Sequence, residues 1–180
     1  MTFSVALRYL GMLEGDYTVD DGGPTLCGVT QTAWDQYCQQ KGMTSVPVRT
    51  LTNAQVADFY WFSYWKPLCL DEIPDGLDFV VFQWAINHEG AGDAGQAVRD
   101  LQICAGANPD GIMGPMTVKC VQTFAFPLKL ASCVLDRQEA WYKEAASKNP
   151  ALPLDGWLNR VRRCRAFLKM HETGESNVRP

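Results

Sequence analysis

The sequence predicts a mainly α-helical α+β protein, in which one small β-hairpin accompanies a helical bundle around a central buried helix. Three observations lead to this prediction. Apolar residues recur at three- and four-residue spacing in several stretches, as in amphipathic helices. Residues 77–86 are apolar on nearly every side, which is typical of a helix inside a core. One strong turn signal, Asp20-Asp21-Gly22-Gly23, lies between short segments that can pair as strands.

Size and charge narrow the class of protein. The chain has 180 residues, of which 47% are hydrophobic and 20% charged, as in an ordinary globular protein. This length supports one compact domain or two small lobes, and we expect a monomer. A net charge of −4 argues against a nucleic-acid partner, which would require a basic patch. No apolar run reaches the length of a membrane span.

Residues 3–13 are predicted to form a mostly buried helix. Its apolar residues recur at helical spacing: Phe3, Ala6, Leu7, Leu10 and Leu13. Glu14 follows at the C-terminal end. The negative end of the helix dipole and an apolar wall both disfavour an ionised carboxylate there, so we expect a raised pKa for Glu14. A carboxyl group that stays protonated near neutral pH can act as a general acid.

A hairpin and two further helices are predicted next. Residues 17–19 and 25–29 are the expected strands on either side of the glycine turn. Thr30 is a suitable N-cap for a helix that Gly42 ends. Thr52 and Gln55 form a capping-box pattern at the start of an aromatic helix that stops before Pro67.

The polar connection at residues 70–76 marks the predicted lobe boundary. A catalytic lobe covers residues 1–72 and a helical lobe residues 73–180, and we expect them to pack as one globular unit. The helical lobe begins with the central buried helix. Further helices are predicted over residues 94–104, after Pro115, and over residues 127–148 and 154–170. The last carries a basic cluster that we interpret as a solvated face rather than a ligand site: Arg160, Arg162, Arg163, Arg165 and Lys169.

The seven cysteines are odd in number and form no C-x-x-C pair. Most fall within apolar helical patterns, so we expect free buried thiols rather than a zinc site or a disulfide framework. Free thiols indicate synthesis in a reducing compartment. One or two bridges are the alternative if the protein reaches the periplasm.

Acidic residues gather around the glycine turn: Glu14, Asp16, Asp20 and Asp21. One interpretation is conformational, because turns collect Asp and Gly. The other pairs a helix-end Glu with an Asp across a hairpin, as glycosidases do. One acid then protonates the leaving oxygen, while the other carboxylate orients water or attacks the anomeric carbon. The residues alone leave both interpretations open.

Motifs along nearly the whole chain resemble one family in the family's order. The first is Glu14-Gly-Asp-Tyr17 followed by Asp20-x-Gly-Gly-x-Thr25-x-x-Gly-Val-Thr30, which resembles the N-terminal motif of glycoside hydrolase family 108. This family of phage endolysins and secreted muramidases cleaves peptidoglycan. The later motifs resemble its C-terminal peptidoglycan-binding region: Trp84-Ala-Ile-Asn87, Ala97-Val-x-x-Leu-Gln102, Asp110-Gly-Ile-Met-Gly-Pro-x-Thr117 and Gly156-Trp-Leu-Asn-Arg-Val161.

The resemblance implies a lysozyme-like fold and assigns roles to the acids. Glu14 is the general acid, Asp20 the second carboxylate, and Thr25 the hydroxyl that helps to hold the nucleophilic water. The hairpin is shorter than usual in the family after Tyr17, so Asp20 and Asp21 compete for the second role. We favour Asp20, which keeps the motif's spacing. Asp16 replaces the family's usual glycine.

Four residues are predicted to contact substrate: Tyr17, Asp21, Asn87 and His88. Asn87 matches a family motif, although satisfying a helix end explains it equally well. His88 either lines the cleft or has a structural role at the helix end. Trp34 and Trp84 are further candidates for stacking on sugars, with core packing as the alternative. No His, Cys and Asp cluster has metal-ligand spacing, so no metal and no cofactor is expected.

We therefore expect a lysozyme or N-acetylmuramidase that binds peptidoglycan glycan strands and cleaves the β-1,4 bond between N-acetylmuramic acid and N-acetylglucosamine. The alternative is a non-catalytic peptidoglycan-binding or phage structural protein with the same fold. No signal peptide is recognisable, so we expect synthesis in the cytoplasm and delivery to the periplasmic or extracellular cell wall by a holin or secretion machinery. The acidic composition suggests an effector with an immunity protein.

Overall fold

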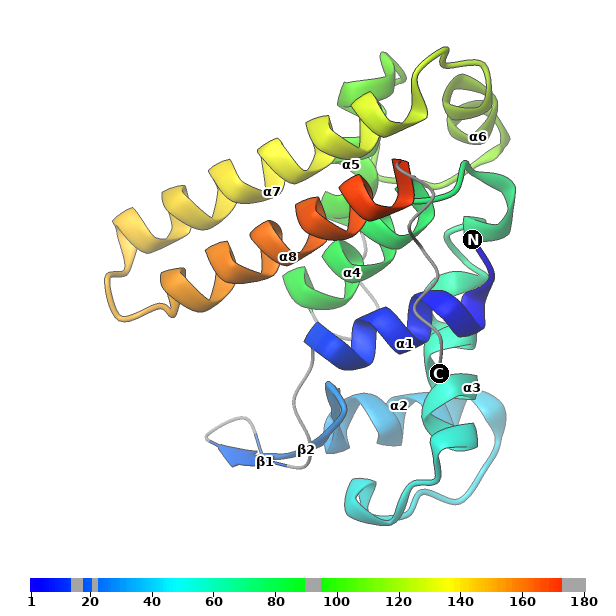
Figure 1. Ribbon diagram of the computed structural model, residues 1–180. Helices are drawn as coiled ribbons and strands as arrows, with labels where there is room; N and C mark the ends of the chain where they lie inside the picture. Colours follow the sequence, from blue (N-terminus) through cyan, green and yellow to red (C-terminus); the bar gives the residue numbers. More distant parts are fainter. Residues whose placement is uncertain (14–17, 21–22, 90–94, 173–180) are drawn as a thin grey trace.

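The computed structural model describes residues 1–13, 18–20, 23–89 and 95–172, and it confirms the mainly α, lysozyme-like fold class (Figure 1). The α-helices in the described part of the chain are α1 (Phe3–Leu13), α2 (Gln31–Lys41), α3 (Asn53–Tyr60), α4 (Leu77–Glu89), α5 (Gly95–Ala105), α6 (Pro115–Gln122), α7 (Pro127–Lys148) and α8 (Leu154–Glu172). Three short helical turns accompany them: η1 (Val48–Thr50), η2 (Trp61–Trp65) and η3 (Leu70–Glu72).

The small sheet has one strand more than the predicted hairpin. It is antiparallel, with the order β1 (Thr18–Asp20), β2 (Gly23–Leu26) and β3 (Val29–Thr30). The expected strand over residues 25–29 is interrupted because Cys27 and Gly28 both have positive φ angles, of 49° and 81°. Two consecutive positive φ angles make a tight two-residue turn, which pairs Leu26 with Val29.

The first helix is amphipathic rather than mostly buried, which corrects the prediction for residues 3–13. Ala6 and Leu10 are buried, but Val5 is 37% exposed. The ring of Phe3 packs against that of Trp61, with centroids 5.2 Å apart. One face of α1 therefore meets the core, and the other face is open to solvent.

The predicted helix ends are confirmed. The Thr30 hydroxyl accepts a hydrogen bond from the backbone N–H of Ala33 at 3.2 Å, and Gly42 ends α2 in the left-handed conformation. Thr52 and Gln55 form both hydrogen bonds of the capping box at the start of α3. The aromatic segment then continues as the π-helical turn η2 and ends before Pro67.

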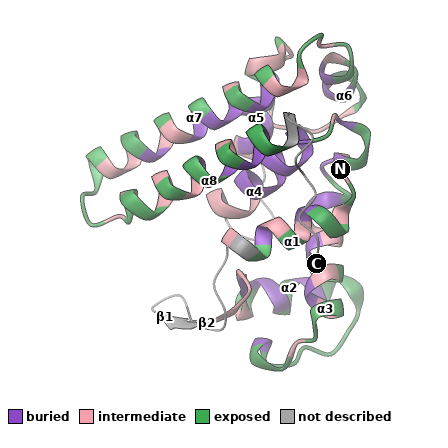
Figure 2. Cartoon of the chain, viewed as in Figure 1, coloured by how far each residue is buried: buried purple, intermediate pink, exposed green. Residues whose placement is uncertain are grey.

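The central buried helix is α4, which contacts α5, α7 and η2. Most of its ribbon is coloured as buried in Figure 2. Its first three turns are buried: Leu77, Asp78, Phe79, Val80, Val81, Phe82, Gln83, Trp84 and Ala85. The aromatic rings of Trp65 and Phe82 pack edge to face, with centroids 5.2 Å apart, so one apolar core includes residues from both predicted lobes. The lobe boundary itself stays a prediction.

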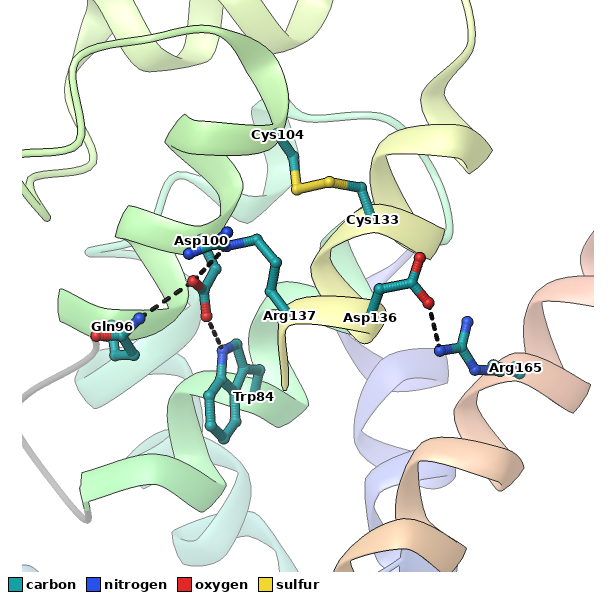
Figure 3. Close-up of a disulfide and its surroundings, with 8 residues drawn as sticks. All are labelled: Trp84, Gln96, Asp100, Cys104, Cys133, Asp136, Arg137 and Arg165. Carbon is teal, nitrogen blue, oxygen red and sulfur yellow. Dashed lines mark hydrogen bonds and ion pairs between the residues drawn. A yellow bond between two sulfur atoms is a disulfide. The ribbon is translucent and has the colours of Figure 1, made fainter. Parts of the chain in front are cut away.

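A disulfide between Cys104 and Cys133 joins α5 to α7 (Figure 3). This bond corrects the expectation of free thiols for these two residues. The helices pack side by side and bring the two Cα atoms to 6.0 Å, although the residues are 29 apart in the chain. Such a tertiary contact leaves no spacing signal in the sequence. Cys38, Cys69, Cys120 and Cys164 are free thiols.

The same part of the bundle contains a buried carboxylate, Asp100 on α5. It accepts hydrogen bonds from Trp84 Nε1 at 3.0 Å and from Arg137 Nε at 2.7 Å (Figure 3). Asp100 thus connects α4, α5 and α7 through partners that balance its charge.

Over the described ranges, no single helix is long and apolar enough to cross a membrane. Only α6 and α7 taken together reach the required length and composition, and they are bent by 119° where they meet.

Candidate active site

Of the predicted catalytic residues, Asp20 and Thr25 lie on the small sheet that follows α1 in the chain. Glu14, Tyr17 and Asp21 fall outside the described residues. Asp20 ends β1, where its backbone pairs with that of Gly23. Thr25 is half-buried on β2 and pairs with Thr18 on one side and Thr30 on the other.

The strand register relates two of the predicted site positions. Residue 18 is opposite Thr25 and residue 20 is opposite Gly23, so positions 20 and 25 are diagonal neighbours in the β1–β2 ladder. Diagonal positions of an antiparallel pair are separated by roughly 7–8 Å. This backbone spacing is compatible with the joint role that the resemblance gives to residues 20 and 25.

A polar pocket of about 250 Å³ opens where α1 and α4 end and α8 begins. Its lining residues are Leu13, Asn87, Gly156, Trp157, Asn159, Arg160 and Arg163. Leu13 in this lining directly precedes the predicted general acid, Glu14, in the chain. Of the predicted substrate-binding residues, Asn87 is the one that the structure places in this lining.

The contribution of α8 follows from helical periodicity. Gly156, Arg160 and Arg163 recur at four- and three-residue intervals, which places them on one face of the helix. That face is turned toward the ends of α1 and α4. Arg160 is half-buried, whereas Arg163 is exposed.

A buried chain of hydrogen bonds reaches Asn87 from the core. Gln83 Nε2 donates to Gln138 Oε1 at 2.8 Å, and Gln138 Nε2 donates to the Tyr142 hydroxyl at 2.8 Å. The Tyr142 hydroxyl in turn donates to Asn87 Oδ1. Gln83, Gln138 and Tyr142 are fully buried. Gln138 Nε2 also donates back to Gln83 Oε1 at 3.3 Å, and Gln83 Nε2 donates to the Val80 carbonyl at 3.1 Å. Because a carbonyl only accepts, it orients the two glutamine amides, and the Tyr142 hydroxyl that accepts from Gln138 is left to donate to Asn87.

An aromatic side chain forms one wall of the pocket. The Trp157 ring stacks on the buried Tyr142 ring, with centroids 4.8 Å apart and an interplanar angle of 24°. Trp34 and Trp84, in contrast, are only 1% and 0% exposed. Their proposed role in sugar stacking is therefore wrong, because both rings are enclosed by the core. Trp157 is the aromatic residue at the pocket that the sequence analysis missed.

His88 lies next to Asn87 in the chain but packs elsewhere. Its ring meets the rings of Trp84 and Trp141 edge to face, with centroids 4.9 and 4.5 Å apart. His88 does not line the polar pocket. This position favours the structural role, and a substrate contact by His88 stays a prediction.

The basic cluster on α8 divides into three environments. Arg165 forms ion pairs with Asp136 and Glu139 of α7, at 2.7 and 3.3 Å (Figure 3 shows the Asp136 pair). Arg162 and Lys169 are exposed, as a solvated face requires. Arg160 and Arg163 instead line the pocket, which corrects the solvated-face interpretation for these two. The helical spacing from Gly156 through Arg160 to Arg163 was the signal that could have distinguished them.

The motif around Asp110 is organised by a buried glutamine. Gln102 Nε2 donates to Asp110 Oδ1 at 2.8 Å and to Thr117 Oγ1 at 3.0 Å, while Gly111 N–H donates to Gln102 Oε1 at 2.9 Å. Hydrogen bonds from the backbone N–H of Ile112 and from Gln102 hold the pKa of Asp110 below its usual value. These contacts give the motif a structural explanation.

Among the described residues, no group of three or more His, Cys, Asp and Glu side chains is arranged to hold a metal ion.

Comparison with known proteins agrees with the motifs. Residues 8–89 match the family model "Glycosyl hydrolase 108". The predicted resemblance to glycoside hydrolase family 108 is confirmed. The matched span contains Glu14, the whole sheet and Asn87, so the glycosidase-like segment of this chain includes all of the predicted catalytic positions.

A solved structure extends the similarity beyond that span. SagA from Brucella abortus is similar to this chain with a TM-score of 0.73 and 27% sequence identity, over 93% of each chain. No curated protein matches the chain. Since the SagA likeness covers nearly the whole chain, it includes helices that follow the family match. The family supports the general class of glycoside hydrolase for this chain.

Proposed function

We propose that this glycoside hydrolase is a peptidoglycan hydrolase of the N-acetylmuramidase type, which cleaves the β-1,4 bond between N-acetylmuramic acid and N-acetylglucosamine. Glu14 protonates the glycosidic oxygen, while Asp20 and Thr25 hold and orient the attacking water. The observation that carries the proposal is the family match over residues 8–89, because this one segment includes the end of α1 and the whole sheet.

The local environment supports the role of Glu14. The helix before it ends with buried Leu10 and half-buried Leu13, and its carbonyl end carries partial negative charge. Both features favour a protonated carboxyl group, which a general acid requires. The diagonal positions of residues 20 and 25 support a shared role for Asp20 and Thr25 on the sheet.

The first test replaces the proposed acid. Glu14→Gln keeps the size of the side chain but removes the proton donor, so release of reducing ends from purified peptidoglycan should fall by about 10²–10⁴-fold. The melting temperature should stay close to that of the parent. Release at the parent rate would show that Glu14 is not the acid. If neither protein releases reducing ends although both sediment with cell-wall sacculi, the chain is a binding protein instead.

The second test separates the two neighbouring aspartates. Asp20→Asn should impair reducing-end release strongly, and Asp21→Asn should impair it less, because Asp20 keeps the spacing of the motif. A larger loss in Asp21→Asn would reverse the assignment. Mass spectrometry of the products identifies the sugar at the new reducing end, and N-acetylglucosamine there would contradict muramidase activity.

A further inference from the structure

The pocket beside Asn87 is lined by hydrogen-bond donors. Arg160 and Arg163 each carry a guanidinium group, which has five N–H donors and no acceptor. Asn159 contributes an amide from the same helix. The lining residues that the structure describes include no acidic side chain. Because each guanidinium has several donors, both arginines can donate hydrogen bonds to a ligand and to a neighbouring protein group at the same time.

The buried hydrogen-bond chain adds another donor. The Tyr142 hydroxyl accepts from Gln138 and therefore donates to Asn87 Oδ1. The acceptor of the Asn87 amide is thus used toward the core, and its Nδ2 donor is the group left to face a ligand in the pocket. Two guanidinium groups and a fixed amide donor match a group that only accepts hydrogen bonds, as a carboxylate does.

We propose that Arg160, Arg163 and Asn87 bind a carboxylate that the substrate carries beside its sugar chain. This inference rests on the proposed function and specifies its substrate. In peptidoglycan such a carboxylate belongs either to the stem peptide or, where the peptide has been removed, to the lactyl group of the muramic acid. Leu13 of the pocket lining directly precedes Glu14 in the chain, and the Trp157 ring forms a wall suited to the face of a sugar.

The test combines protein variants with modified substrates. The proteins are the parent, Arg160→Gln, Arg163→Gln and the control Arg162→Gln, which makes the same change at an exposed position of α8. The substrates are purified sacculi, the same sacculi with carboxyl groups amidated, and glycan strands freed of stem peptides, whose carboxylate is the lactyl group. The rate of reducing-end release gives KM and kcat for each combination.

On untreated sacculi, Arg160→Gln and Arg163→Gln should each raise KM by about tenfold, the effect of losing one charge-assisted hydrogen bond. Arg162→Gln should behave as the parent. On amidated sacculi the parent's KM should rise by a similar factor, and the arginine variants should then match it. If Arg160→Gln and Arg163→Gln still raise KM on peptide-free strands, the lactyl carboxylate is the ligand. If they no longer raise KM there, the stem peptide supplies the carboxylate.

Three outcomes would overturn the inference. One is an equal KM of the parent for untreated and amidated sacculi. This comparison remains valid even if an arginine variant fails to fold. Another is a rise in KM for Arg162→Gln as large as that for Arg160→Gln and Arg163→Gln. The third is a lower kcat on every substrate with KM unchanged, which would show that the arginines position the general acid. Absence of release from all substrates would refute the proposed function instead, and sedimentation of parent and variants with the same three substrates would then decide the inference.

Discussion

At the scale of single residues, the direction of each hydrogen bond matters as much as its presence. Tyr142 accepts from Gln138 and donates to Asn87, so one hydroxyl connects the core to the pocket. Its ring is fully buried and stacks on Trp157. The sequence predicts neither the direction nor the length of this series of hydrogen bonds. Its residues come from α4 and α7, which are distant along the polypeptide: Gln83, Asn87, Gln138 and Tyr142.

Tyr142→Phe should lower the free energy of unfolding by about 1–3 kcal/mol, because it removes the hydroxyl but leaves the buried Gln138 amide and the half-buried Asn87 amide without that partner. Urea unfolding measures the loss. Tyr9→Phe is the matched control, because the structure shows no hydrogen bond for the Tyr9 hydroxyl among the described residues. A control loss as large as that of Tyr142→Phe would show that the hydrogen-bond chain adds no stability.

The buried thiol of Cys164 makes stability depend on pH in the alkaline range. Burial raises the pKa of Cys164 from 9.0 to about 12. Above pH 9 the thiol of the unfolded chain ionises while the folded one keeps its proton, so stability falls as the pH rises between these two values. The slope contributed by this group is at most about 1.4 kcal/mol per pH unit.

This effect can be isolated by comparison with Cys164→Ala, which lacks the ionisable group. The parent should lose stability faster than the variant when chemical unfolding is repeated between about pH 8 and about pH 10.5. Parallel stability profiles for the two proteins would be inconsistent with a thiol whose pKa is raised by burial.

At the scale of elements, local sequence signals predicted helix ends better than they predicted burial. The caps at Thr30, Gly42 and Thr52 are confirmed, because each depends on residues within one turn. The burial of α1 was overestimated, because apolar spacing identifies a face but not what covers it. The turn at Cys27 was missed, because a non-glycine residue with positive φ gives no local signal.

Thr52→Ala should destabilise the protein by about 1 kcal/mol, because it removes the hydroxyl that caps α3. Thr52→Ser keeps that hydroxyl and should recover most of the loss. Thermal unfolding followed by circular dichroism distinguishes the two variants. Equal melting temperatures for Thr52→Ala and the parent would mean that the capping box does not contribute to stability.

At the scale of the whole molecule, the fold class was predictable and the contacts between helices were not. The apolar residues on nearly every side of the segment 77–86 identified α4 as the central helix. The family motifs are spread along nearly the whole chain, and the similarity to SagA covers 93% of it. The pairing of Cys104 with Cys133 and the pocket lined by Arg160 depend on how helices pack. The sequence motif containing Arg160 was recognised, but the neighbours of its side chain were not.

Removing the disulfide should lower the free energy of unfolding by about 3–4 kcal/mol, because the bond closes a long loop in the unfolded chain. The double variant Cys104→Ala/Cys133→Ala, compared with the parent in urea, measures this loss. A thiol reductant should bring the parent to a similar stability and leave the variant unchanged. A further loss in the reduced variant would reveal a contribution from another disulfide.

The hydrogen-bond chain from Gln83 to Asn87 also has a consequence for how proteins similar to this one diverge. Each bond in the chain fixes the donor and acceptor sense of the next, so a change at one of the four positions leaves a buried group unmatched unless a second position changes with it. Positions 83, 87, 138 and 142 should therefore covary among relatives that share this fold. Substitutions at such positions are best introduced as sets, in natural evolution and in engineering alike.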